Sequence, residues 1–323
     1  MSVVLVTPRS FRESDSAAVA RLEEAVDEVR YNDLGRPLSA VELRDRLADV
    51  DGLLAGLDAV DGSALEAAPR LRVVARYGAG VDNVDLQAAA RRGVAVTNTP
   101  GANAGAVAEW TLLLMLAMCR PLMAADRAVR QGRWPVLRGR ELSARTVGLL
   151  GLGRVGERVA AGVAGLGGHV LAHDPYLPAP PVGVELVELD ELARRSEVLS
   201  LHAPLTCATR GVVGADLLSS LPPGAVLVNT ARGELIDEAA LLAALETGPL
   251  AAAALDVLAE EPPPADHPLL GRDDVLITPH AAPHTAEATG AMARAAVDDL
   301  LAVLEGREPR FAIGVEEEHA GGR

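Results

Sequence analysis

Lysine is absent from the 323-residue sequence, in which all 30 basic residues are arginines. This absence excludes a Schiff-base lysine and the lysine of a Walker-type phosphate loop. Aromatic residues make up only 2% of the chain, so the hydrophobic cores must be built from Ala, Val and Leu. With 45 acidic residues, the net charge is −15, which argues against a nucleic-acid-binding surface.

Cysteine is also scarce. Cys119 and Cys207 lie in unrelated contexts, so their spacing predicts neither a metal site nor a disulfide framework. The longest apolar segment, residues 110–119, is about half of the ~20 residues needed to span a bilayer. The short apolar run at the N-terminus ends at Pro8 and does not resemble a signal peptide. We therefore expect a cytoplasmic protein without a membrane or nucleic-acid partner.

One glycine-rich stretch, Val-Gly-Leu-Leu-Gly-Leu-Gly-Arg-Val-Gly, occupies residues 147–156. It predicts a strand, a tight turn and the start of a helix. In such a motif Gly151 permits the turn, Gly153 lets the backbone approach a pyrophosphate, and Gly156 lets the helix pack closely on the strand. The helix N-terminus adds N–H groups and a partial positive charge. The competing interpretation is a glycine cluster that serves packing alone.

Asp174 strengthens the first interpretation, because it ends the next predicted strand, 18 residues after Gly156. A carboxylate there can accept hydrogen bonds from ribose hydroxyls and repels a 2′-phosphate. The stretch therefore predicts a dinucleotide site that prefers NAD to NADP.

Strands alternate with helices along most of the chain, which indicates parallel α/β sheets. The predicted strands are residues 3–7, 51–55, 71–76, 94–97, 147–151, 170–173, 198–202, 225–229, 251–255 and 275–278, with a short extended piece at 184–187. Helix-like spacing covers residues 14–29, and Ser39 with Glu42 forms a capping box. The last six strands fit a doubly wound, Rossmann-type cofactor domain.

The first strands form a smaller α/β domain. Residues 98–103 have the turn chemistry of a linker, and a long helix at 286–305 is expected to return to the first lobe, which makes that domain discontinuous. We predict a substrate domain of residues 1–99 plus 285–315, an NAD-binding domain of residues 100–284, and a disordered tail at 316–323. Residues 121–142 form an amphipathic helix and an irregular arm, in which Trp134 either enters the core or anchors a subunit interface.

Three residues follow predicted strands of the second lobe: Arg232, Glu261 and His280. Because ligands in open α/β sheets bind beyond the carboxyl ends of the strands, these side chains can meet in one cleft. Arginine can clamp a carboxylate, histidine can transfer a proton near neutral pH, and a carboxylate can orient the imidazole and favour its charged form. With a nicotinamide, the set suits interconversion of 2-keto and 2-hydroxy acids.

Each residue also has a simpler interpretation. Arg232 could cap a loop, and Glu261 could be a solvated charge in its acidic, proline-rich segment. We expect His202, also at a strand end, to make loop hydrogen bonds. The sequence indicates no partner for four other histidines, which are His173, His267, His284 and His319.

Several stretches together resemble the D-isomer-specific 2-hydroxyacid dehydrogenase family, with the closest likeness to its phosphoglycerate dehydrogenase-like members. They are residues 76–85 (RYGAGVDNVD), 98–103 (NTPGAN), 107–109 (VAE), the glycine turn with Asp174, 202–206 (HAPLT), 229–233 (NTARG), 256–262 and 278–280 (TPH). They occur in the order of the family and span nearly the whole chain.

The resemblance implies a catalytic triad of Arg232, Glu261 and His280, and a flavodoxin-like first lobe that closes by hinges near residues 98–103 and 282–285. It also implies a homodimer through the cofactor domain. The implied cofactor-binding residues are Gly151, Gly153, Arg154, Val155, Gly156, Asp174, Ala203, Thr230, Ala231 and Asp256. The implied substrate-binding residues are Gly78, Ala79, Gly80, Asn103 and Arg232. No metal is expected.

The sequence departs from the pattern of phosphoglycerate dehydrogenases at the loop that would meet a substrate phosphate. Phosphoglycerate dehydrogenases of this family usually carry an arginine in the loop after the strand at 51–55, whereas residues 56–59 here are Gly-Leu-Asp-Ala, with Asp58 as an added acid. We also expect no amino-acid-binding regulatory domain after Gly314. Glu261 separates the chain from similar formate dehydrogenases, which carry glutamine there.

We therefore predict an NAD-dependent D-2-hydroxyacid dehydrogenase or 2-keto acid reductase. The alternatives are a related enzyme acting on glyoxylate, hydroxypyruvate, 3-phosphoglycerate or phosphite, and a non-catalytic NAD-sensing module on the same scaffold.

Overall fold

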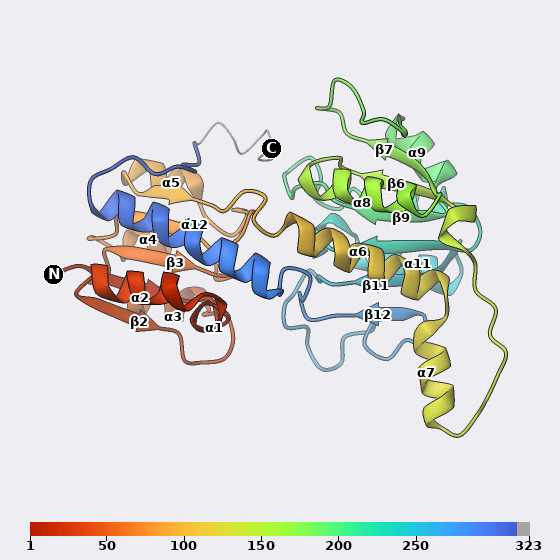
Figure 1. The fold of residues 1–323 in the computed structure, drawn as a ribbon, viewed down its shortest axis with the longest axis horizontal. Coiled ribbons are helices and arrows are strands. Elements are labelled where there is room, and N and C mark those ends of the chain that lie inside the picture. The colour runs from red at the N-terminus through yellow and green to blue at the C-terminus, as the bar shows by residue number, and fades with distance from the viewer. Residues whose placement is uncertain (315–323) are drawn as a thin grey trace. The chain divides into compact units, whose positions relative to one another are not determined.

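The computed structural model describes residues 1–314 (Figure 1). Contacts divide the chain into two compact units: unit 1 is Met1–Asn103 together with the chain from Pro283 onward, and unit 2 is Ala104–Ala282. The domain limits at 99/100 and 284/285 stay a prediction. The tail predicted at 316–323 lies outside the described residues.

Unit 1 contains a parallel five-stranded sheet in the order β2-β1-β3-β4-β5. Its strands are β1 (Val3–Val6), β2 (Glu28–Tyr31), β3 (Gly52–Ala55), β4 (Val73–Arg76) and β5 (Ala95–Thr97). This is the flavodoxin-like order, so the predicted class of the smaller domain is confirmed.

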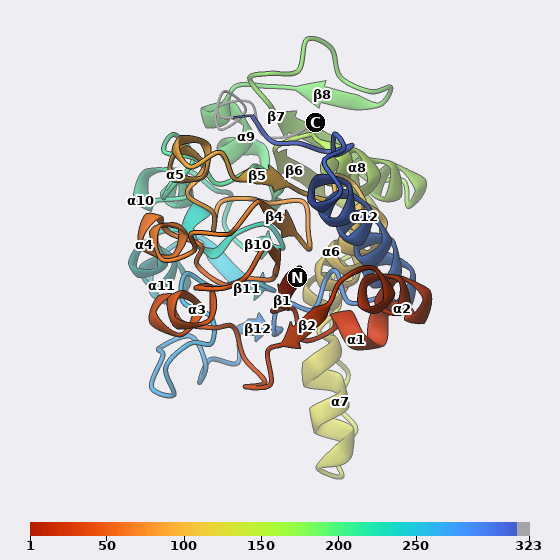
Figure 2. The same cartoon turned by 90° about the vertical axis from the view of Figure 1, so that its left-hand side faces the viewer.

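Period-2 alternation sends neighbouring residues of each strand to opposite faces of this sheet. Val4 and Val6 pack with helices α1 (Phe11–Ser14), α2 (Ser16–Ala25) and α12 (Ala286–Leu304). Val3 and Leu5 pack on the other face with α3 (Ala40–Arg46), α4 (Gly62–Glu66) and α5 (Leu86–Arg91). Figure 2 shows the two groups of helices on either side of the strands. The return of the long C-terminal helix to the first lobe is thus confirmed.

Unit 2 contains a parallel seven-stranded sheet in the order β12-β11-β10-β9-β6-β7-β8. Its strands are β6 (Thr146–Leu150), β7 (His169–His173), β8 (Val184–Leu186), β9 (Val198–Leu201), β10 (Ala225–Asn229), β11 (Leu250–Leu255) and β12 (Val275–Ile277). This is the Rossmann order extended by one strand, as predicted. The strand order reverses between β6 and β9.

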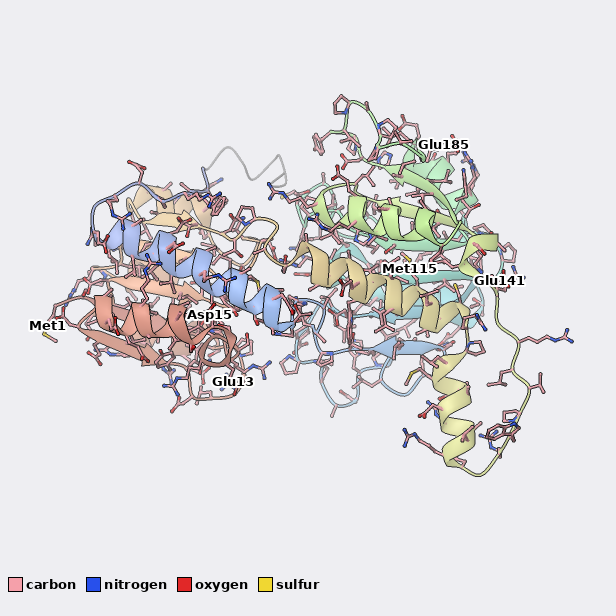
Figure 3. All side chains as sticks on the ribbon, viewed as in Figure 1. Met1, Glu13, Asp15, Met115, Glu141 and Glu185 are labelled. Atoms are coloured by element: carbon pink, nitrogen blue, oxygen red, sulfur yellow. The ribbon has the colours of Figure 1, made fainter. Side chains whose placement is uncertain are left out.

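Helices cover both faces of this sheet. One face packs on α6 (Ala104–Cys119) and α8 (Arg154–Gly165), where Met115, labelled in Figure 3, is buried. The other packs on α9 (Leu189–Arg195), α10 (Ala215–Ser219) and α11 (Glu238–Glu246). Helix α7 (Leu122–Arg130) and the irregular arm after it project away from this sheet (Figure 1).

The prediction of one helix over residues 14–29 is wrong. Asp15 caps α2 by accepting from the N–H groups of Ala17 and Ala18, and the helix ends at Ala25. Residues 28–31 form the edge strand β2, whose side chains are half-buried at best. Its sequence, Glu-Val-Arg-Tyr, alternates polar and apolar residues over only four positions, which is the shortest run that can indicate a strand. The capping box of Ser39 and Glu42 is confirmed at the start of α3.

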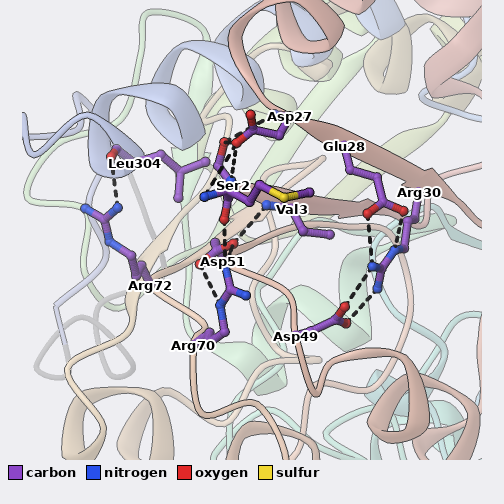
Figure 4. A network of polar contacts seen from close by, with 11 residues as sticks. Ser2, Val3, Asp27, Glu28, Arg30, Asp49, Asp51, Arg70, Arg72 and Leu304 are labelled. Carbon is purple, nitrogen blue, oxygen red and sulfur yellow. Dashed lines mark hydrogen bonds and ion pairs between the residues drawn. The ribbon is translucent and has the colours of Figure 1, made fainter.

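The N-terminal ends of the unit 1 strands are tied by a polar network (Figure 4). The Asp51 carboxylate accepts from the Val3 N–H and from the Arg70 guanidinium. Arg72 donates to the carbonyls of Val303 and Leu304, the last residues of α12. The side chains of Asp51, Arg70 and Arg72 bind backbone groups or one another at the starts of the strands, so they hold α12 and the sheet together.

Within residues 1–314, no single helix is long and apolar enough to cross a membrane; α6 and α7 together meet the length and composition, but they are bent by 66°.

Candidate active site

The sheet of unit 2 brings the sequence-predicted residues to one edge. Because all seven strands are parallel, Gly151, Asp174 and His202 directly follow β6, β7 and β9. Thr230 and Asp256 directly follow β10 and β11, and His280 lies three residues beyond β12. These positions share the carboxyl edge, where open α/β sheets bind their ligands.

The three glycines of the motif have three separate reasons to be glycine. Gly151 has φ +95°, and a Cβ there would lie 2.6 Å from the Ala203 nitrogen, across the point where the strand order reverses. A Cβ on Gly156 would lie 2.5 Å from the Gly151 oxygen, which explains how α8 packs on the turn. A Cβ on Gly153 would meet no described atom within 4 Å.

The open space beside Gly153 is what a pyrophosphate needs. Gly153 is the N-cap of α8 and has no side chain. No N-cap side chain therefore covers the free N–H groups of the first turn, which include those of Arg154 and Val155. The residues present therefore fit a dinucleotide.

Asp174 closes the other side of this turn. Its Oδ2 accepts from the Leu152 N–H at 3.0 Å and its Oδ1 from the Tyr176 N–H at 3.0 Å. A carboxylate has about four acceptor positions, so ribose hydroxyls can still bind. The same negative charge disfavours a 2′-phosphate.

The loop after β10 is fixed by a side-chain amide. Buried Asn229 donates from Nδ2 to the Arg232 carbonyl at 2.7 Å and accepts from the Ala231 N–H at 3.0 Å. The Thr230 hydroxyl lies 2.7 Å from the Thr111 hydroxyl of α6, which donates to the Val107 carbonyl. Since Thr111 has one proton, Thr230 donates to Thr111, which leaves the Thr230 oxygen as an acceptor.

His280 and Glu261 lie in contact, as their positions after neighbouring strands predict. His280 Nδ1 lies 2.9 Å from Glu261 Oε2, and the two side chains are 21% and 30% exposed. A carboxylate only accepts hydrogen bonds, so the proton of this bond sits on Nδ1, and Nε2 is the ring nitrogen left for another partner.

The backbone of His280 is held in an unusual conformation. Its φ of +54° is in the left-handed region, which non-glycine residues adopt mainly where the surrounding structure enforces it. Asp256 provides that enforcement: its carbonyl accepts from the His280 N–H, and its carboxylate accepts from the N–H groups of Ala281 and Ala282 and from the Thr278 hydroxyl. Asp256, which is only 1% exposed, therefore aims the imidazole.

Arg232 begins the loop beside this pair. Its Nη1 donates to the Ala231 carbonyl at 2.7 Å. A Cβ on the next residue, Gly233, would lie 1.9 Å from the Leu258 carbonyl carbon, so the Arg232 loop touches the loop that carries Glu261. The structure thus brings His280 and Glu261 into contact and places Arg232 on the adjoining loop.

Three other histidines of unit 2 have hydrogen-bond partners. His202 Nε2 lies 3.0 Å from the Oγ of Ser200, so the partner belongs to strand β9 and not to a loop as expected. Desolvation lowers the pKa of this ring to about 4. His173 Nδ1 lies 3.0 Å from the Val187 carbonyl oxygen. His267 has a partner that the sequence did not indicate, Glu238 of α11 at 3.1 Å. Only tertiary contacts reveal that pair, since 29 residues separate its members.

The glycine loop of unit 1 follows β4. Gly78 has φ +152°, and its carbonyl accepts from the Thr99 N–H, while the Ala79 carbonyl accepts from Asn98 Nδ2. These bonds hold residues 78–80 at the carboxyl edge of that unit's sheet, and Asn103 lies in the turn before α6. Asp58 is not an exposed acid: it is 1% exposed and accepts from the Thr7 hydroxyl and the N–H groups of Leu38 and Gly56.

Cys119 is buried and Cys207 is exposed. Trp134 is 88% exposed, which excludes the core interpretation of that residue.

A Rossmann sheet with a glycine turn open to a pyrophosphate, and a carboxylate–imidazole pair on the same edge, defines a dinucleotide-binding oxidoreductase site. Comparison with known proteins identifies which kind. The family model described as "D-isomer specific 2-hydroxyacid dehydrogenase, NAD binding domain" matches residues 112–282. The chain belongs to this family, and unit 2 contains its NAD-binding domain.

Individual proteins similar to this chain are also named as dehydrogenases or reductases of small acids. A D-3-phosphoglycerate dehydrogenase of Archaeoglobus fulgidus is 39% identical over 91% of this chain and 58% of its own length. A glyoxylate reductase of Korarchaeum cryptofilum is 38% identical over 96% of both chains. The crystal structure of an NADPH-dependent glyoxylate/hydroxypyruvate reductase from Sinorhizobium meliloti, in complex with NADP and malonate, is 33% identical, covers 97% of both chains and has a TM-score of 0.85. The chain thus spans little more than half of the phosphoglycerate dehydrogenase but nearly all of the glyoxylate reductase.

Proposed function

We propose that the protein reduces a small 2-keto acid, or oxidises the corresponding D-2-hydroxy acid, with NAD as its cofactor. The observation that carries this proposal is the 2.9 Å contact between His280 and Glu261 at the cofactor edge of a Rossmann sheet. A protein that only sensed NAD would not need a proton-transfer group there, which argues against the binding-module alternative.

Bound NAD supplies hydride exchange at C2 of the substrate. Arg232 binds the substrate carboxylate and polarises the C2 oxygen, since a guanidinium forms bidentate hydrogen bonds with carboxylates. In reduction, His280 Nε2 holds the proton that passes to the C2 oxygen, and Glu261 keeps the imidazole oriented and stabilises its charge. The residues proposed to hold the cofactor are Gly151, Gly153, Arg154, Val155, Gly156, Asp174, Ala203, Thr230, Ala231 and Asp256.

The substrate class follows from two observations. Residues 56–59 contain no cation that could meet a phosphate, and relatives matched over their whole length are named glyoxylate reductases. We favour an unphosphorylated acid such as glyoxylate or hydroxypyruvate over 3-phosphoglycerate or phosphite. The backbone of Gly78, Ala79 and Gly80, with Asn103, is proposed to bind this acid.

Two further proposals concern the setting of the enzyme. We propose a homodimer formed through unit 2, supported by the exposed apolar side chains of α7 and the arm after it. A cytoplasmic location stays a prediction, consistent with the two free cysteines.

The decisive experiment is a substrate panel. Wild type and His280→Ala are assayed with glyoxylate, hydroxypyruvate, pyruvate, phosphohydroxypyruvate and phosphite, each with NAD(H) and NADP(H). We expect turnover of an unphosphorylated 2-keto acid with NADH, and a kcat reduced by roughly 100- to 10,000-fold in His280→Ala, the usual contribution of a general acid. NADH binding without turnover of any acid would favour the sensing module, and an unaffected kcat in His280→Ala would refute the role of the imidazole.

A further inference from the structure

The catalytic carboxylate is carried by an unusually long loop. Residues 256–274 connect β11 to β12 without a helix or strand of their own. A loop of this length in a compact unit needs specific contacts if one of its side chains is to hold a fixed position. The contacts of the residues around Glu261 show what supplies them.

One carboxylate ties together both limbs of this loop. Glu238 Oε1 accepts from the Ala259 N–H at 3.1 Å, and Glu238 Oε2 lies 3.1 Å from His267 Nε2. The Leu269 N–H approaches His267 Nδ1 at 3.4 Å, so Nδ1 is an acceptor and the ring proton sits on Nε2, facing Glu238. Ala259 precedes Glu261 and His267 follows it, so Glu238 clasps the segment that carries the catalytic acid.

Glu238 is itself well anchored. It lies in the first turn of α11, where the helix N-terminus stabilises a negative charge, and Asp237 caps that turn. Leu241 and Leu245 of the same helix are buried in the core of unit 2. The Glu238 and His267 side chains are 25% and 10% exposed, so their hydrogen bond is partly shielded from water.

The clasp leads directly to the acid–base pair. Leu258, the residue before Ala259, donates its N–H to Glu261 Oε1 at 3.1 Å, and Glu261 Oε2 binds His280. Displacing Ala259 therefore moves the donor that orients the Glu261 carboxylate. We propose that Glu238 and His267 are positioning residues, which act on catalysis by fixing Glu261 against His280. The catalytic part of this inference rests on the proposed function.

The test compares variants of the clasp with a matched control. Glu238→Ala and His267→Leu remove the clasp, while His267→Gln keeps a side-chain N–H donor that can reach Glu238. Glu246→Ala is the control, because Glu246 joins the same helix to the far end of the same loop through Arg272, 3.6 Å away. Two measurements are made: kcat and KM with the best keto acid, and amide hydrogen exchange of peptides covering residues 256–268, followed by mass spectrometry.

We expect Glu238→Ala and His267→Leu to speed exchange in residues 256–268 and to lower kcat by roughly 10- to 100-fold, the effect of a displacement of about 1 Å at a catalytic group. KM should change much less. His267→Gln should stay near wild type, and Glu246→Ala should change neither kcat nor exchange at 256–268.

Three results would overturn the proposal: unchanged exchange in both clasp variants, faster exchange with an unchanged kcat, or His267→Gln as impaired as His267→Leu. Exchange does not depend on turnover. A wild type that reduces no acid would count against the proposed function, and the exchange data would then still decide whether the clasp holds the loop.

Discussion

One partly buried histidine, His202, should make the stability of this protein depend on pH. Burial lowers the pKa of His202 to about 4, from an ordinary value near 6.5. Between these values the unfolded chain binds a proton that the folded chain does not, so the free energy of unfolding falls as the pH decreases from about 6.5 to 4. At pH 5 the loss amounts to about 2 kcal/mol for this residue.

Urea unfolding at pH 7 and pH 5 measures this effect. His202→Asn, which has no titrating ring, should lose less stability between the two pH values than wild type. His169→Asn serves as the control, since the His169 side chain is 54% exposed. Equal pH-dependent losses in wild type and His202→Asn would contradict the assignment.

For individual residues, the sequence predicted which side chains lie at the carboxyl edge of the unit 2 sheet. It did not predict the hydrogen bonds that hold these side chains in place. Strand ends in a parallel sheet converge, so Glu261 and His280 could be grouped from the order of the strands alone. The hydrogen bonds of Asp256 to Ala281 and Ala282 could not, because they depend on a left-handed backbone at His280. The Glu238–His267 contact joins α11 to a loop without regular structure, for which sequence periodicity carries no signal.

At the scale of elements, the glycine turn of unit 2 offers two substitutions with opposite expected outcomes. A Cβ on Gly153 would meet no described atom within 4 Å, so Gly153→Ala should fold normally, with at most about 1 kcal/mol lost at the N-cap. It should weaken NADH binding by about tenfold or more, because the new methyl group occupies the approach of the pyrophosphate.

Gly156→Ala should act on folding instead. Alanine ordinarily stabilises a helix by about 1 kcal/mol relative to glycine. Here its Cβ would lie 2.5 Å from the Gly151 oxygen, and this clash should reverse the sign and cost roughly 1–3 kcal/mol. Thermal unfolding and NADH fluorescence titration of both variants check the pair. A destabilised Gly153→Ala with normal NADH affinity would contradict our assignment of that space to the cofactor.

The elements of the buried sheets were predictable and the edge strand was not. Central strands such as β1 and β3 are buried on both faces and appear in the sequence as continuous apolar runs. Strand β2 has the sequence Glu-Val-Arg-Tyr and only partial burial, so its pairing with β1 decides its conformation. Tertiary pairing therefore outweighed local pattern at one element of unit 1.

At the scale of the whole molecule, exposed apolar side chains of unit 2 indicate an interface with another protein chain. We define the arm surface as the exposed apolar residues of α6, α7 and the segment that returns to Glu141, labelled in Figure 3. They are Leu113, Leu116, Leu122, Met123, Val129, Trp134, Val136 and Leu137. Exposed apolar side chains that gather on one segment of the chain are typical of protein–protein interfaces, and tryptophan is enriched at the energetic centres of such interfaces.

We predict that a second copy of the chain covers the arm surface. The double variant Trp134→Arg, Val136→Asp should shift the protein from twice the mass of one chain to the mass of a single chain in sedimentation equilibrium, because it places charges where apolar side chains are buried in the dimer. Val182→Asp is the matched control: Val182 is as exposed as Val136 but lies in the segment between β7 and β8, away from the arm surface. A wild type that is monomeric at micromolar concentration, or a double variant that stays dimeric, would show that the arm surface does not join two copies. The proposed NAD-binding residues all belong to unit 2 of a single chain and lie outside the arm surface, so the monomeric variant should bind NADH as wild type does. This measurement separates loss of the dimer from loss of the fold.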